Sequence, residues 1–282
     1  YSREARKKMG QLLTDIPVDI VHLHNIYHHI SPSILPEIKK RNIPIVMTLH
    51  DYKLIAPNYT LFHHGAVHEE DAKGWYWSTT KNKSVKNSRL QSAVLQSEMI
   101  IHHKLLKYYE KYVDKFIAPS EFIMNLCIKY GWPREKFIHI PHYAEKPTTS
   151  SSKKEGDYVA YVGRIAEEKG LRTLLEAAKL SPNIPYVIVG EGPLKAELEK
   201  RVQKEQITNV EFTGFLTGKA LNKRITEARL LVVPSIWYEN YPLSILEPKA
   251  AAQVVIGSSI GGIPELLPKA LLVSPGDAAE LD

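Results

Sequence analysis

Residues 158–193 decide the fold class, and they read YVAYVGRIAEEKGLRTLLEAAKLSPNIPYVIVGEGP. A short apolar run ends at Gly163, apolar residues at helical spacing cover 170–180, and a second apolar run ends at Gly190. Strand, helix and strand in this order predict a parallel β-α-β unit. A glycine directly after a strand also lets a ligand approach the backbone closely.

The same alternation extends to both ends of the chain. In the second half we expect further strands at 210–213, 230–234, 254–257 and 270–273, and helices at 193–206, 219–228, 245–252 and 263–267. In the first half we expect strands at 19–24, 43–49 and 115–118, and helices at 33–40, 88–112 and 121–130. Ser120 is placed to cap the last of these helices. Residues 57–87 show little period and are predicted to form a long loop.

The polar segment KPTTSSSKKEG, residues 146–156, is typical of a linker. It separates two α/β domains, an N-terminal one at 1–145 and a C-terminal one at 157–282. Two Rossmann-like domains joined in this way predict a cleft between them. In such sheets ligands bind beyond the carboxyl ends of the strands.

Composition limits the possible partners. The 282 residues carry a net charge of +6, which favours anionic ligands. We find no zinc-finger or RNA-binding signature and expect no nucleic-acid partner. No apolar run approaches the ~20 residues that cross a bilayer. The single cysteine, Cys127, cannot form an intrachain disulfide, so a reducing, cytoplasmic setting is expected.

The strand ends of the second half carry the candidate chemistry. After the first strand, Arg164 and Lys169 flank the turn into a helix, and two cations beside a helix start suit a diphosphate. After the second, the glycines of 190–193 favour a tight turn or a close ligand approach. After the third comes Gly214-Phe215, where the aromatic ring forms either a wall for a nucleobase or, as we favour here, part of the core.

The fourth strand end holds two carboxylates, Glu239 in a loop and Glu247 just inside a helix. Amides of the loop and the helix start could cradle phosphate oxygens between them. Each carboxylate could accept two hydrogen bonds from sugar hydroxyls. The alternative for Glu247 is structural, because Ser244 and Glu247 match a capping box. Glu239 follows Trp237 and Tyr238 and has no such alternative.

Together these segments resemble family 4 of the retaining glycosyltransferases, which have the GT-B fold of two Rossmann-like domains. The resemblance rests on GR at 163–164, KG at 169–170, GEGP at 190–193, GF at 214–215 and GGIPE at 261–265, with Glu239 and Glu247 in between. It covers essentially the whole chain. It implies that both domains lack a terminal portion, because the chain has no glycine-rich loop near its start and no closing helices at its end.

The resemblance implies a role for each matching residue of the second domain. Arg164 and Lys169 would bind the donor diphosphate. Glu239 would bind the donor sugar, and Glu247 the ribose. The other donor-binding residues that it implies are Gly163, Leu243 and Ser244 near the phosphates, Gly190, Glu191, Gly192 and the Leu216 backbone near the base, and Tyr241.

In the first domain, VHLHN at 21–25 and TLHD at 48–51 look like the acceptor-side strand ends of that family. His50 would face the acceptor, with His24 and Asp51 beside it. Imidazole has an unperturbed pKa near ~6.5, which suits it to steer or deprotonate a hydroxyl. Asp51 could orient the ring, although adjacent residues of a strand point in opposite directions.

The implied reaction moves a sugar from a nucleoside-diphosphate sugar, with a UDP or GDP leaving group, to a saccharide or lipid-linked acceptor in polysaccharide or glycolipid biosynthesis. No metal or other cofactor is expected, because the two cations stabilise the leaving group. Retention of configuration is implied by the resemblance alone. The alternatives are a GT-B-fold sugar-nucleotide epimerase and a non-catalytic sugar-nucleotide binder.

Two further features of the first domain remain open. Trp75, Tyr76 and Trp77 in the long loop are candidates for contact with the acceptor or with a membrane, which would place the protein at the inner membrane face. The histidines of this half could instead build a zinc site, from His22 and His24 with Asp71 or Glu69. Other histidines of the same half that could contribute are His28, His29, His63, His64 and His68.

Overall fold

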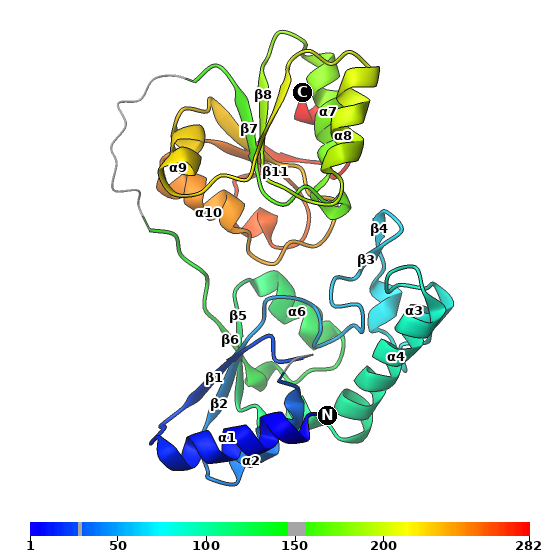
Figure 1. The fold of residues 1–282 in the computed structure, drawn as a ribbon, viewed down its shortest axis with the longest axis vertical. Helices are drawn as coiled ribbons and strands as arrows, with labels where there is room; N and C mark the ends of the chain where they lie inside the picture. The colour runs from blue at the N-terminus through cyan, green and yellow to red at the C-terminus, as the bar shows by residue number, and fades with distance from the viewer. Residues whose placement is uncertain (28–29, 146–155) are drawn as a thin grey trace. The chain divides into compact units, whose positions relative to one another are not determined.

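The computed structural model describes residues 1–27, 30–145 and 156–282, in two compact units, Tyr1–Pro141 and His142–Asp282 (Figure 1). The predicted linker lies, except for Gly156, outside the described residues. Each unit is built on a parallel sheet flanked by helices. The predicted α/β class with two Rossmann-like halves is confirmed.

The first unit has a four-stranded sheet of order β1-β2-β5-β6, parallel throughout. Its strands are β1 (Val21–His24), β2 (Ile45–Thr48), β5 (Lys115–Ala118) and β6 (Phe137–His139). Its longer helices are α1 (Arg3–Asp15), α4 (Arg89–Met99) and α6 (Glu121–Lys129), and its shorter ones α2 (Leu35–Lys39), α3 (Trp77–Lys81) and α5 (Tyr108–Tyr112). Ser120 caps α6 as predicted, because its hydroxyl accepts a hydrogen bond from the Ile123 amide.

Two predictions for this unit were wrong. The expected loop at 57–87 contains a two-stranded hairpin of β3 (Phe62–His63) and β4 (Ala66–Val67), and then α3. Its turn is His64-Gly65, both with positive φ, and such short elements leave no period in the sequence. The single helix expected at 88–112 is three: α4 continues as the π-helical η3 (Ile100–Leu105), and α5 follows Lys107, whose φ is +50°.

The second unit has a six-stranded parallel sheet of order β12-β11-β10-β7-β8-β9. The strands are β7 (Val159–Val162), β8 (Tyr186–Val189), β9 (Val210–Gly214), β10 (Leu230–Val233), β11 (Val255–Ser258) and β12 (Leu272–Val273). The main helices are α7 (Leu171–Leu180), α8 (Lys195–Lys204), α9 (Gly218–Thr226) and α10 (Leu243–Ala250). Numbered along the chain, this is the doubly wound order 3-2-1-4-5-6, which reverses direction between β7 and β10.

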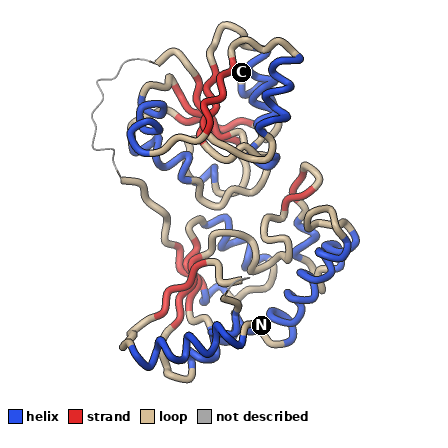
Figure 2. The backbone as a smooth tube through the Cα atoms, in the orientation of Figure 1, coloured by secondary structure: helices blue, strands red, loops and turns tan. Residues whose placement is uncertain are grey.

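Helices cover both faces of this sheet (Figure 2). Alternate residues of β7 divide between the two faces, so Val159 and Tyr161 pack with α7 and α8, whereas Ala160 packs with the side of α9 and α10. A strand buried on both faces reads as a continuous apolar run, which is why the sequence revealed it. The carboxyl ends of β7 and β10 lie side by side and position the site described next.

Among the described residues, no helix is both long enough and apolar enough to cross a membrane.

Candidate active site

The candidate donor site lies at the switch point of the second sheet, where the loops after β7 and β10 meet. The first loop carries Gly163, Arg164 and Lys169, and the second carries Glu239. The Ile236 amide donates to the Glu168 carbonyl at 3.0 Å and ties the two loops together. The topology therefore brings together residues about 70 positions apart in the sequence.

Glycine is required at two of these turns. Gly190 has a φ of +144°, and a Cβ there would lie 1.9 Å from the Gly163 carbonyl oxygen. Gly170 has a φ of +70°, and a Cβ there would lie 1.8 Å from the Pro234 carbonyl oxygen. No side chain fits at such distances, so both turns bring backbone against backbone. Gly190 thus lets the loop after β8 pack against the loop after β7, and Gly170 lets the loop after β7 pack against the loop after β10.

The Glu239 carboxylate is the most firmly held group of the site. It is only 5% exposed. Its Oε1 accepts one hydrogen bond from Lys169 Nζ and another from the Ser235 hydroxyl, both at 2.7 Å. Within the described part of the chain, Oε2 accepts no hydrogen bond from a side chain or amide. One oxygen is thus fixed by the protein, and the other is available to a ligand hydroxyl.

Lys169 is held from two sides. Its ammonium lies 4.9 Å from the centroid of the Trp237 ring, a distance at which a cation is attracted to an aromatic face. The Trp237 indole Nε1 is buried without a hydrogen-bond partner among the described residues. Arg164 is more exposed and pairs with Glu168 at 2.9 Å. The two predicted phosphate-binding cations therefore occupy the same loop but have different partners.

A cavity of about 320 Å³ adjoins the β7 loop. Its lining residues are Val162, Gly163, Arg164, Val189, Gly190, Glu191, Phe215, Leu216 and Leu221. Apolar side chains and backbone atoms form most of the lining, which suits the binding of a flat heterocycle. Phe215 is 72% exposed, so the expectation that it packs in the core was wrong. Its ring is instead an open face at the rim of this cavity.

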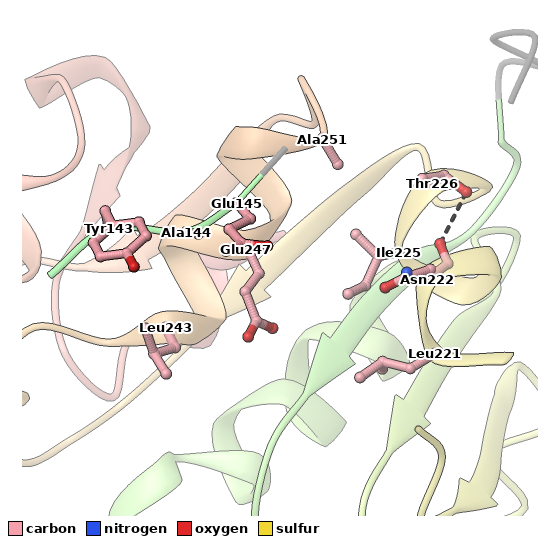
Figure 3. A pocket seen from close by; sticks show the side chains of 10 residues that line it. All are labelled: Tyr143, Ala144, Glu145, Leu221, Asn222, Ile225, Thr226, Leu243, Glu247 and Ala251. Atoms are coloured by element: carbon pink, nitrogen blue, oxygen red, sulfur yellow. Dashed lines mark hydrogen bonds between the residues drawn. The ribbon is translucent and has the colours of Figure 1, made fainter. Parts of the chain in front are cut away.

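A second cavity, of about 520 Å³, is lined by Glu247 and by Leu243, one of the helix-start residues (Figure 3). Leu221 borders both cavities. The capping-box alternative for Glu247 is wrong, because α10 begins at Leu243 with Pro242 as its N-cap and has no side-chain cap. The Glu247 side chain is exposed, with no hydrogen bond or ion pair to any of the residues described, and is available to a ligand.

The start of α10 contributes backbone donors. Leu243 and Ser244 are its first two residues, so their amides have no acceptor within the helix. The Tyr241 ring just before them contacts the His142 ring, with centroids 6.2 Å apart. Of the remaining predicted donor residues, Glu191 pairs with Lys195 at 2.5 Å, and Gly192 packs against the backbone of Ile165.

On the first sheet, the predicted acceptor-side residues follow β1 and β2. His24 Nδ1 and His50 Nε2 share a hydrogen bond of 2.7 Å. Asp51 accepts a hydrogen bond from the Lys53 amide at 2.9 Å, and burial raises its carboxyl pKa to about 6. The structure thus joins His24 and His50 into one hydrogen-bonded pair, and Asp51, next to His50 in the sequence, is a buried carboxyl group with a raised pKa.

The zinc alternative is not supported. Asp71 lies 3.2 Å from His63 and accepts a hydrogen bond from Asn58, while Glu69 pairs with Lys129. Across 1–27, 30–145 and 156–282, no three His, Cys, Asp or Glu side chains are grouped to hold a metal. Two of the histidines, at positions 28 and 29, lie outside the described residues.

Comparison with known proteins decides the family. Residues 1–143 match the model of Glycosyltransferase Family 4, and residues 144–281 match that of Glycosyl transferases group 1. The chain belongs to glycosyltransferase family 4.

Relatives and solved structures agree with this family assignment. The chain is 24% identical over 268 residues to an uncharacterized 42.6 kDa protein in the cps region of Klebsiella pneumoniae, which covers 94% of this chain and 64% of that protein. It is 29% identical over 182 residues to O-antigen chain mannosyltransferase C of Escherichia coli, covering 58% and 49%. Anabaena Alr3699/HepE, solved with UDP and glucose, superposes with a TM-score of 0.68 at 18% identity, over 98% of this chain and 69% of that one.

These comparisons confirm the GT-B fold. The chain spans about two thirds or less of the length of the curated relatives that it matches.

Sequence reasoning missed two residues of the candidate site. Ser235 is buried and donates to Glu239, and Trp237 lies against Lys169. Both follow a strand end, which was the one available signal. Gly261 belongs to the GGIPE segment on which the resemblance rests, and the structure shows why glycine is needed there. Its φ is +61°, and a Cβ would lie 2.4 Å from the Glu239 carbonyl oxygen. The Gly262 amide donates to that same carbonyl at 2.7 Å.

Proposed function

We propose that this family 4 chain transfers a sugar from a nucleoside-diphosphate sugar to an acceptor hydroxyl, with retention of the anomeric configuration. The observation that carries the proposal is the Glu239 carboxylate, fixed through Oε1 by Lys169 and Ser235 at the sheet's switch point. A buried carboxylate with one oxygen left for a ligand suits recognition of a sugar hydroxyl.

The leaving diphosphate would be stabilised by Lys169, Arg164 and the first amides of α10. In the transfer, the bond between the anomeric carbon and the phosphate oxygen breaks, and the acceptor oxygen forms the new bond. Negative charge accumulates on the departing diphosphate, where fixed cations and helix-start amides lower the barrier. Because these groups supply the positive charge, the proposal requires no metal ion and no other cofactor.

The nucleoside would occupy the two cavities. The base would lie in the 320 Å³ cavity between the Gly190 turn and Leu216, with the exposed ring of Phe215 against its face. Stacking of a base on an aromatic ring contributes about 1–3 kcal/mol. The ribose hydroxyls would then reach Glu247, which lines the adjoining cavity.

On the acceptor side, we propose that the His24–His50 pair orients the acceptor hydroxyl. The 2.7 Å bond between the rings fixes the orientation of His50. The proton lost by the acceptor hydroxyl would pass to this pair or to the departing phosphate oxygen.

The relatives support the substrate classes. HepE was solved with UDP and glucose, and the Escherichia coli relative is an O-antigen chain mannosyltransferase. We accordingly propose a UDP- or GDP-sugar donor, a saccharide or lipid-linked acceptor, and a role in polysaccharide or glycolipid synthesis on the cytoplasmic side of a membrane.

The test is a panel of UDP- and GDP-sugars, first by thermal shift and then by nucleotide release. A ligand that binds only the folded state raises its melting temperature, which selects the donor. Release of nucleoside diphosphate only when an acceptor is present supports transfer. Isomerisation of the sugar without acceptor indicates an epimerase, and binding without turnover indicates a non-catalytic binder. The anomeric coupling of the product in NMR spectra tests retention.

A further inference from the structure

The net charge of the chain is concentrated in residues 72–109. This segment has seven cationic residues and one acidic residue, a net charge of +6 that equals that of the whole chain. The cations are Lys73, Lys81, Lys83, Lys86, Arg89, Lys104 and Lys107. The acidic residue, Glu98, is turned inward, where it pairs at 2.7 Å with Lys53, whose side chain is 1% exposed. Apart from Glu98, the segment presents positive charge alone.

Helix α4, within this segment, buries two polar side chains and exposes two apolar ones. Its buried face includes Ser92 and Gln96, which are hydrogen-bonded inside: the Ser92 hydroxyl accepts from the Val85 amide, and Gln96 bonds Thr80 and the Trp75 carbonyl. Its exposed side carries Leu90, 75% exposed, and Val94 one turn further on. Folding has therefore buried Ser92 and Gln96 together with Met99 and left Leu90 and Val94 in water, whereas an ordinary surface helix turns such apolar side chains inward.

The exposed apolar side chains continue on both sides of α4. Ile101 and Leu105, four residues apart on η3, are exposed, and so is Leu106. At the start of α3, Trp77 is 71% exposed and Trp75 is about half exposed. Tyr76 between them is buried, so it is not part of this surface, contrary to the sequence-based expectation for all three aromatics.

We propose that α3, α4 and η3 form a surface that binds an anionic lipid bilayer. Basic residues beside outward Trp and Leu side chains are the composition of interfacial membrane segments, in which the cations attract acidic headgroups and the apolar side chains enter the boundary region. A nucleic acid would use the cations but would leave Leu90 and Val94 without a partner. The negatively charged leaflet is the cytoplasmic one.

This surface would bring the chain to a lipid-linked acceptor, a purpose that rests on the proposed function. Lipid binding itself does not depend on transfer and is measured separately from it.

The experiment is flotation of the whole chain with phosphatidylcholine vesicles, with and without phosphatidylglycerol. The wild type should float only with the anionic vesicles, and less in high salt. Each basic residue near such a surface contributes about fivefold to the partition coefficient, so replacing Lys81, Lys83 and Lys86 with Gln should lower it roughly 100-fold. Leu90→Asp with Val94→Asp should also abolish flotation. The matched control, Leu180→Asp, alters an exposed leucine of the other unit.

Three outcomes would overturn the proposal: no flotation of the wild type, equal binding to neutral vesicles, or flotation of the Leu90 and Val94 variant at the wild-type level. Tighter retention by duplex DNA than by vesicles, lost in the lysine variant but kept in the leucine and valine variant, would assign the surface to nucleic acid instead. A thermal shift with UDP or GDP on each variant shows that the chain is folded. It also keeps failure of lipid binding distinct from failure of the proposed function.

Discussion

Replacement of Lys169 with Met should reduce nucleoside-diphosphate binding and transfer far more than it reduces stability. The ammonium donates to Glu239 Oε1 at 2.7 Å and faces the Trp237 ring at 4.9 Å. Removing one partner of a fully buried pair costs about 3–5 kcal/mol. The Lys169 side chain is 22% exposed, so solvent offsets part of this and we expect a loss of about 2 kcal/mol in unfolding free energy.

The effect on catalysis should be larger. Loss of one group that stabilises charge on the departing diphosphate costs about 3 kcal/mol, or roughly 10²-fold in rate. Misplacement of Glu239 adds to this, so kcat/KM should fall between about 10² and 10³-fold. Lys169→Arg should recover part of the loss, because it keeps the charge.

The assay pairs calorimetric titration of UDP and GDP with urea denaturation of each variant. Lys179→Met is the matched control, because this cation pairs with Glu205 on the same unit outside the candidate site. Unchanged nucleotide affinity in Lys169→Met, together with the expected loss of stability, would refute the reasoning, since Lys169 would then serve the fold alone.

Three further predictions test the other parts of the site. Glu247→Ala should weaken nucleoside binding about tenfold, because one charged hydrogen bond is lost. The melting temperature should not change, because the residue is exposed and caps no helix. A large fall in melting temperature would instead indicate a structural role for Glu247. Phe215→Ala should weaken UDP or GDP binding by about 1–3 kcal/mol without loss of stability, because the ring is exposed. A destabilised variant would indicate that the ring packs in the core. The folded-state pKa of Asp51, about 6, lies above its ordinary value of 3.8, so the native state binds more protons between these values and loses stability as pH rises through them. Asp51→Asn should remove this loss of stability, which is measured as the difference between the urea midpoints at pH 4 and pH 7. If that difference is the same in the variant as in the wild type, the prediction is contradicted.

The parallel sheets were predictable because their strands are buried on both faces and read as apolar runs. Strand β8 and strand β5 were predicted with the bounds that the structure gives them. The hairpin β3–β4 was not, since two-residue strands leave no alternation to detect.

The candidate site was predictable only where a residue type carried its own signal. Lys169 and Glu239 stood out by charge at a strand end. The roles of Ser235 and Trp237 depend on which strand lies beside β10, and that pairing joins segments about 70 residues apart.

Two errors have local physical causes. The Ser244–Glu247 pattern matches a capping box, in which Ser244 would be the N-cap. In the structure Pro242 is the N-cap, with extended backbone at a φ of −71° and a ψ of 124°, and the helix begins at Leu243, one residue before Ser244. Phe215 follows β9, which is an edge strand of the sheet formed by the described residues, and its side chain is left largely exposed.

The most direct test of the central claim is acceptor-dependent release of nucleoside diphosphate, measured for the wild type and for Glu239→Ala with the donor that the thermal-shift panel selects. We predict release by the wild type, and none above background by the variant, although the variant still binds the nucleotide. Equal rates for the two proteins, or a wild type that binds no nucleotide sugar, would contradict the account.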